Sequence, residues 1–216
     1  MPRALPRWAE FMRLRLVQAD PLANSDLIFV LAGHRNRKVF GVRLLRDGWA
    51  SRILLSTGDP PYIARVLEKE LQASARPNRK VWSDIHNVAN RPSPSAGQFF
   101  AFLDNTGWSV QQIPIQGLGT LSEIKALAAW LQQRPAIRSI LIVSAATHLK
   151  RAGMCCRHLL PASCRVRLIA VPPQIADGSP LTGRAPREGS RTILLEWGKI
   201  MLYRAVLAFC SRVQDR

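Results

Sequence analysis

The chain has 216 residues, of which 47% are hydrophobic, so it is long enough and apolar enough to bury a core of its own. It carries 31 lysines and arginines against 14 aspartates and glutamates, which gives a formal net charge of +17. These values exclude an intrinsically disordered chain, and the excess of positive charge favours anionic partners.

The first 25 residues form a basic amphipathic segment (1–25). Trp8, Phe11, Met12 and Leu16 recur there at near-helical spacing among arginines. Such a segment either packs on the same domain or lies on an anionic membrane surface. Because the arginines interrupt any apolar signal sequence, we expect a cytoplasmic protein, with peripheral contact at the inner membrane as an open alternative.

Residues 26–58 have the pattern of a βαβ unit. A buried strand at 26–31 is followed by a turn, a helix that stops at Gly48, and a second strand at 51–58. A helical crossover makes the two strands parallel, so we expect them to lie in one sheet.

The pattern weakens at 59–96, which we interpret as an insertion or lid over the core. Within it the sequence predicts a helix at 62–71, a short strand at 80–82 and a Pro/Ser-rich loop at 91–96. The regular alternation then resumes. Its predicted members are a helix near 98–105, a strand at 110–115, a helix at 119–134, a strand at 138–143, a helix at 148–160, a strand at 166–171, a loop at 172–189 and a helix from 191 to about 209.

Nearly all of these strands are aliphatic and alternate with helices, which predicts a mostly parallel sheet with helices on both faces. The predicted fold class is therefore a Rossmann-like three-layer α/β sandwich, spanning 26–188. The last segment, 189–216, is predicted as a helix that packs on this domain. Its apolar stretch is interrupted by Glu196, Lys199 and Arg204, whereas a bilayer span needs about 20 predominantly apolar residues.

The junction after the 138–143 strand is the strongest indication of function. Lys150 and Arg151 fall in the first turn of the next helix, where the helix dipole disfavours cations. An anion bound there would remove the conflict. Backbone N–H groups of the helix start, together with Thr147, His148 and Arg151, would form its cradle.

In parallel α/β sheets, ligands bind beyond the carboxyl ends of the strands. The turns that should converge there are rich in polar residues and glycine. The ligand-binding candidates are Gly33, His34, Arg37, Ser56, Thr57, Gly58, Thr120, Glu123, Ser144 and Thr147, and the catalytic candidates are His148 and Arg151.

Several of these candidates have a second interpretation. Thr120 and Glu123 have the spacing of a capping box, which favours a structural role for them. His34 is either a general base or a solvent-facing turn residue.

His148 and Arg151 lie three residues apart on one helix face. They could bind one anion together, with His148 as acid or base, or they could pair with a carboxylate such as Glu196 or Glu123.

Several classes of site have no support in the sequence. The four cysteines form no CxxC pair, so we expect reduced thiols rather than disulfides or zinc. No nucleophile elbow surrounds Ser56 or Ser144, and neither a Walker A sequence nor a GxGxxG motif occurs. The site turns offer few carboxylates, so we predict no metal site and assign no cofactor.

The order of the motifs resembles the bacterial YdcF/SanA/ElyC family, an envelope-linked domain family of unknown function. The likeness covers residues 26–171, and a family-like glutamate stands at Glu196. The segments that carry it are 31–34, 37–50, 53–58, 119–123 and 143–152. The resemblance implies a Rossmann-like fold and a lipid-carrier or nucleotide-type ligand, in lipid-carrier or peptidoglycan metabolism.

Together, the residues and the resemblance predict a protein that binds an anionic, phosphate-bearing small molecule. If it is an enzyme, phosphoryl or lipid-carrier phosphate chemistry is the expected reaction. The alternative is a noncatalytic basic protein that binds an anionic membrane surface or nucleic acid. Nucleic acid has less support, because few aromatic residues lie among the arginines.

Overall fold

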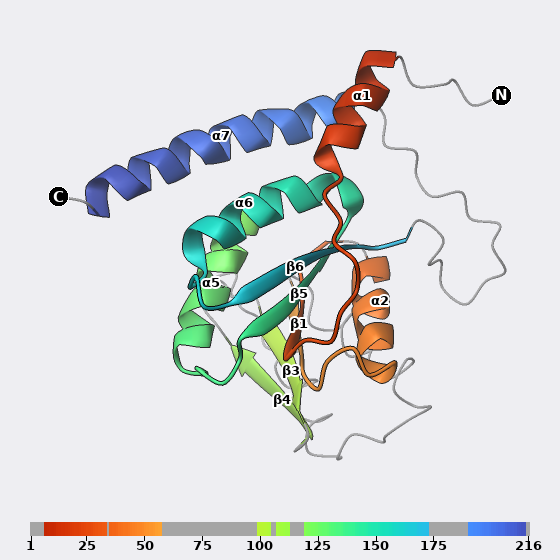
Figure 1. Cartoon of the computed structure of the whole chain (residues 1–216), viewed down its shortest axis with the longest axis vertical. Coiled ribbons are helices and arrows are strands. Elements are labelled where there is room, and N and C mark those ends of the chain that lie inside the picture. The colour runs from red at the N-terminus through yellow and green to blue at the C-terminus, as the bar shows by residue number, and fades with distance from the viewer. Residues whose placement is uncertain are drawn as a thin grey trace, which may run out of the picture.

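The computed structural model describes residues 7–33, 35–57, 99–104, 107–112, 119–172 and 190–214. They form a sheet with the strand order β4-β3-β2-β1-β5-β6 (Figure 1). Its parallel strands are β2 (Ile53–Thr57), β1 (Leu27–Val30), β5 (Ser139–Ser144) and β6 (Arg165–Ala170). The predicted Rossmann-like α/β fold is confirmed.

Helices cover both faces of this sheet (Figure 1). They are α2 (Arg35–Arg46), α5 (Thr120–Gln132) and α6 (Leu149–Leu159). The side chains of β1 alternate between the faces, as a strand requires. Leu27 and Phe29 belong to the core under α5 and α6, whereas Ile28 and Val30 belong to the core under α2. All four are fully buried, which explains why β1 is apolar throughout.

The βαβ unit predicted at 26–58 is present, with α2 crossing from β1 to β2. A glycine brings α2 close to the sheet, because a Cβ at Gly41 would collide with Cγ2 of Val30. The backbone of α2 therefore lies against β1 at a distance that only glycine permits.

The helix predicted near 98–105 is wrong. This segment forms β3 (Phe99–Asp104), which pairs antiparallel with β2 and with β4 (Gly107–Gln112). A short apolar run fits a buried helix or a strand equally well by periodicity, and its phenylalanines favour the strand. The strand predicted at 110–115 overlaps β4 only at its first residues. The elements predicted within 59–96 lie outside the described residues.

Two terminal helices lie beyond α6, on the outside of that layer (Figure 1). They are α1 (Arg7–Leu16) and α7 (Ser190–Gln214). Leu16 of α1 is buried with Ile193 and Ile200 of α7, and Met12 packs against the same cluster. The N-terminal segment therefore packs on the protein itself through one face. None of the described helices is long and apolar enough to cross a membrane.

Candidate functional site

The carboxyl ends of three parallel strands meet at one edge of the sheet. Val30 of β1 lies opposite Leu55 of β2 on one side and Val143 of β5 on the other. Next to these positions, the structure buries most of the polar side chains that the sequence singled out. Those with at most 8% exposure are Arg37, Ser56, Thr120, Glu123, Ser144, Thr147 and Arg151.

The carboxylate of Glu123 connects three of the converging segments. Its Oε1 accepts hydrogen bonds from the backbone N–H of Ala32 at 2.7 Å and from Oγ of Ser56 at 2.5 Å. The predicted capping box is therefore wrong. Gly119, not Thr120, is the N-cap of α5, and no side chain caps this helix. The Glu123 side chain instead joins α5 to the ends of β1 and β2.

Arg37 links the turn after β1 to His148. Its Nη1 donates to the carbonyl oxygen of Ala32 at 2.6 Å, and its Nη2 lies 2.6 Å from Nδ1 of His148. Because a guanidinium has only donors, Nδ1 of His148 must accept. The proton of a neutral His148 ring then resides on Nε2, which faces Glu196.

Glu196 of α7 is the point where His148 and the cationic side chains of Lys199 and Arg151 converge. Its Oε1 lies 3.3 Å from Nε2 of His148 and 2.9 Å from Nζ of Lys199, and its Oε2 lies 3.4 Å from Nη1 of Arg151. The residue is 1% exposed. Burial by itself would raise the pKa of Glu196, but hydrogen bonds from His148 and Lys199 and the charge of Arg151 lower it to about 2. The sequence left open whether His148 and Arg151 bind an anion or pair with a carboxylate, and in this structure both contact Glu196.

Glu196 also explains how α6 tolerates basic residues in its first turn. No acidic residue lies in that turn, and no side chain caps the helix, which follows the short 3-10 helix η1 (Ala146–His148). The negative charge comes from α7 instead. Of the two cations predicted there, only Arg151 faces it, since Nζ of Lys150 donates to the carbonyl oxygen of Arg15 at 3.2 Å.

Lys38, Lys199 and Tyr203 belong to the cluster although the sequence did not single them out as site residues. Lys38 is 3% exposed and its Nζ lies 3.4 Å from the carbonyl oxygen of Gly33. The ring of Tyr203 lies 5.5 Å from the Arg151 guanidinium. A signal exists for Lys199, which stands three residues after Glu196 on α7. No local pattern could have indicated Tyr203.

Two glycines of the site leave room for these side chains. Gly33 has φ of 131°, and a Cβ there would lie 2.7 Å from Nη1 of Arg37. A Cβ at Gly119 would lie 2.7 Å from the hydroxyl of Tyr203. Both positions therefore require glycine. His34 and Gly58 lie outside the described residues, as does the side chain of Thr57.

The described residues contain no group of three or more histidine, cysteine or acidic side chains that could hold a metal ion. The described thiols are free, and burial raises the pKa of Cys155 to about 12 and that of Cys156 as well. Both therefore remain protonated at neutral pH and are poor nucleophiles.

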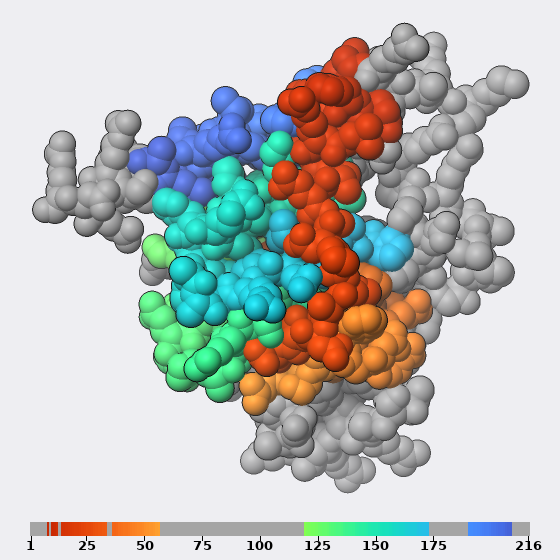
Figure 2. Space-filling model, in the orientation of Figure 1, coloured from red at the N-terminus to blue at the C-terminus, as the bar shows by residue number. Residues whose placement is uncertain are grey.

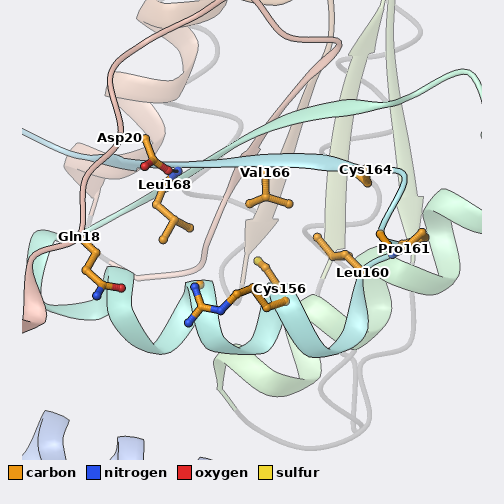
Figure 3. Close-up of a pocket in the computed structure, with 11 residues that line it drawn as sticks. Gln18, Asp20, Cys156, Leu160, Pro161, Cys164, Val166 and Leu168 are labelled. Atoms are coloured by element: carbon orange, nitrogen blue, oxygen red, sulfur yellow. Dashed lines mark hydrogen bonds between the residues drawn. The ribbon is translucent and has the colours of Figure 1, made fainter.

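A pocket of about 490 Å³ lies away from this cluster, between α6 and the edge strand β6 (Figure 3). Its lining combines apolar side chains of α6 and β6 with the polar side chains of Gln18, Asp20 and Arg157 and with the thiols of Cys156 and Cys164. Burial raises the pKa of both thiols. At its rim, Asp20 covers the open edge of β6 through two hydrogen bonds to Leu168, both at 2.7 Å. The N–H of Asp20 donates to the carbonyl oxygen of Leu168, and the N–H of Leu168 donates to Oδ2 of Asp20. The pocket shares no residue with the cluster at the strand ends, which has the chemistry that a polar ligand requires.

Comparison with known proteins identifies no relative. No known protein family, no curated protein and no solved structure matches the chain. The fold and the geometry of the cluster are therefore the basis for the function proposed below.

Proposed function

We propose that this protein binds an anionic, phosphate-bearing small molecule at the carboxyl ends of β1, β2 and β5. On the resemblance to the YdcF/SanA/ElyC family we further propose a role in cell-envelope metabolism, that of lipid carriers or peptidoglycan. If the protein is an enzyme, the reaction is phosphoryl or lipid-carrier phosphate chemistry. His148 would then act as the general acid or base of that reaction.

The observation that carries this proposal is a group of cationic side chains and unpartnered donors among the described residues at the carboxyl ends of the strands. Among the described residues of the cluster, four cationic side chains stand against the two carboxylates of Glu123 and Glu196. Three of the cations, Arg37, Lys38 and Arg151, are buried, and the fourth, Lys199, is 48% exposed. Two buried donors at this edge, Nε of Arg151 and Oγ of Ser144, have no hydrogen-bond partner among the described residues, and an anionic ligand would accept from them. Arginine also recognises phosphate through several N–H donors in fixed geometry.

Replacement of Arg151 by alanine tests the proposal. In calorimetric titrations with inorganic phosphate and a phosphomonoester, we expect affinity to fall about tenfold or more, because hydrogen bonds to a charged ligand are lost. Arg46→Ala is the matched control, since it removes the same charge from a side chain that is 44% exposed on α2. Equal affinity of the Arg151→Ala variant and the unmodified protein would refute the assignment.

A second candidate function, noncatalytic binding to an anionic membrane surface, is supported by a separate observation. Of the nine exposed large hydrophobic side chains among the described residues, eight lie on α1 and α7. The two helices lie at the surface of the same end of the molecule (Figure 2). Basic residues accompany these apolar side chains on both helices. Helices that lie in a membrane interface combine these features.

Vesicle sedimentation tests this second function. We expect binding to phosphatidylcholine vesicles that contain phosphatidylglycerol, weaker binding at high salt, and a loss of about tenfold or more in Leu202→Glu, since it places a charge in the contact. Leu202 is 61% exposed on α7, and Leu22, 38% exposed outside both helices, provides the matched control Leu22→Glu. Equal sedimentation of the two variants would contradict a contact through α7. Salt-sensitive retention of single-stranded DNA without vesicle binding would favour nucleic acid instead.

A further inference from the structure

We propose that Glu196 is an internal occupant of the anion site, so that α7 inhibits ligand binding until its carboxylate is displaced. This inference rests on the proposed anion-binding function and adds its regulation. The carboxylate of Glu196 contacts His148 and Arg151, the two residues that the sequence assigns to the anion. It therefore stands where the charged group of a ligand is expected.

The position of Glu196 is complementary to α6. The start of α6 carries the positive end of the helix dipole and Arg151, without an acidic residue in the first turn. Helix starts of this kind bind carboxylates and phosphates alike. A carboxylate from another part of the chain thus supplies the charge that a bound phosphate would supply.

Glu196 nevertheless leaves some hydrogen-bonding atoms of the site without a partner among the described residues. Its Oε2 lies 3.4 Å from Nη1 of Arg151 and has no hydrogen-bond partner among the described residues. Nε of Arg151 and Oγ of Ser144 are likewise buried without a partner in that part of the chain. A carboxylate has two oxygens, whereas a phosphate has more and a larger charge. The unpartnered donors of Arg151 and Ser144 would hydrogen-bond to the additional oxygens of a phosphate, so a phosphate can compete with Glu196.

The attachment of α7 permits such a displacement. Its inner face packs on α1, α6 and η1 through Ile193, Ile200 and Tyr203, and it forms an outer layer over α6 (Figure 1). The core between the sheet and α2 contains no residue of α7. Movement of α7 would therefore uncover Arg151 and leave that core and the parallel strands in place.

The decisive comparison is the affinity of Glu196→Gln for inorganic phosphate, measured by calorimetry on the full chain. Glutamine keeps the size and an acceptor oxygen but removes the charge. An internal competitor that occupies the site about nine-tenths of the time lowers apparent affinity about tenfold, so we expect Glu196→Gln to bind about tenfold more tightly. Asp47→Asn is the matched control, because it removes one charge from a carboxylate side chain that is 53% exposed and should leave affinity unchanged.

A purely structural Glu196 predicts the opposite result. If its role is to orient His148 and Arg151, Glu196→Gln will bind phosphate equally or more weakly, and the inference is overturned. The added affinity must also disappear in the double variant Arg151→Ala/Glu196→Gln. If neither the unmodified protein nor Glu196→Gln binds phosphate, the proposed function itself fails, which is a distinguishable outcome.

Hydrogen exchange of the unmodified protein provides a test that does not depend on the stability of a variant. Displacement predicts that saturating phosphate increases amide exchange in α7 around Glu196 while it decreases exchange at the start of α6. Decreased exchange in both helices would overturn the inference, because α7 would then close on the ligand rather than yield to it.

Discussion

Replacement of Glu123 by alanine is expected to lower the free energy of unfolding by about 3 kcal/mol. The change leaves two donors, the partly buried N–H of Ala32 and the buried hydroxyl of Ser56, without the carboxylate oxygen that accepts from both. Each buried donor that loses its acceptor costs about 1–3 kcal/mol. Urea denaturation followed by circular dichroism measures the difference.

Two comparisons isolate this effect. Asp47→Ala removes an acidic side chain that is 53% exposed and should change stability by no more than about 0.5 kcal/mol. In a double-mutant cycle, Glu123→Ala should cost less in a Ser56→Ala background, because one of the two donors is already absent. Strict additivity of the two substitutions would show that Ser56 and Glu123 do not interact energetically.

Acid is expected to destabilise the protein by about 3 kcal/mol through Glu196 alone as the pH falls from about 4.5 to about 2. The pKa of this carboxyl is about 2 in the folded protein and lies below its ordinary value of 4.5. The folded state therefore binds the proton less readily than the unfolded state does. The stabilisation is fully present above pH 4.5 and is lost as the pH falls through the folded value.

Unfolding free energies measured across this range for the unmodified protein and Glu196→Gln provide the check. The variant should lack this part of the pH dependence, and the two curves should converge toward pH 2. Some dependence should remain from Asp26: burial raises its pKa, but hydrogen bonds from the backbone of Arg138 and from Ser139 lower it overall. If the unfolding free energies of the two proteins change in parallel from pH 5 to pH 2, the Glu196 carboxylate does not stabilise the folded state as expected.

The parallel part of the sheet was predictable because the sequence patterns that indicate it are local. A strand that is buried on both faces must be aliphatic throughout, and a helix between two such strands forces them to be parallel. β6 is a partly exposed edge strand with two arginines, whereas β1, β2 and β5 meet these conditions through their apolar stretches. β3 does not, because a six-residue apolar run fits a helix or a strand, and only pairing with β2 decides between them.

The candidate site was predictable in its location, because the carboxyl ends of parallel strands must meet at one edge. The partners of its side chains were predictable only in part: Glu196 was one alternative for His148 and Arg151, whereas the contacts of Glu123 were not foreseen. Glu123 has the spacing of a helix cap, yet its carboxylate bonds to Ser56, 67 residues away in the chain. Local spacing describes what a side chain can reach along its own helix, and a folded sheet offers other donors closer to it.

The sequence by itself thus determined the parallel α/β core, the edge of the sheet where the polar candidates gather, and the positive charge of the chain as a whole. Tertiary structure decided which charges meet. Glu196 reaches Arg151 and His148 only because α7 packs over α6, and nothing in the local pattern around 190–214 reveals that contact. The physical reason is range: hydrophobic periodicity is encoded within a few residues, whereas a buried ion cluster depends on elements that meet only after the chain has folded.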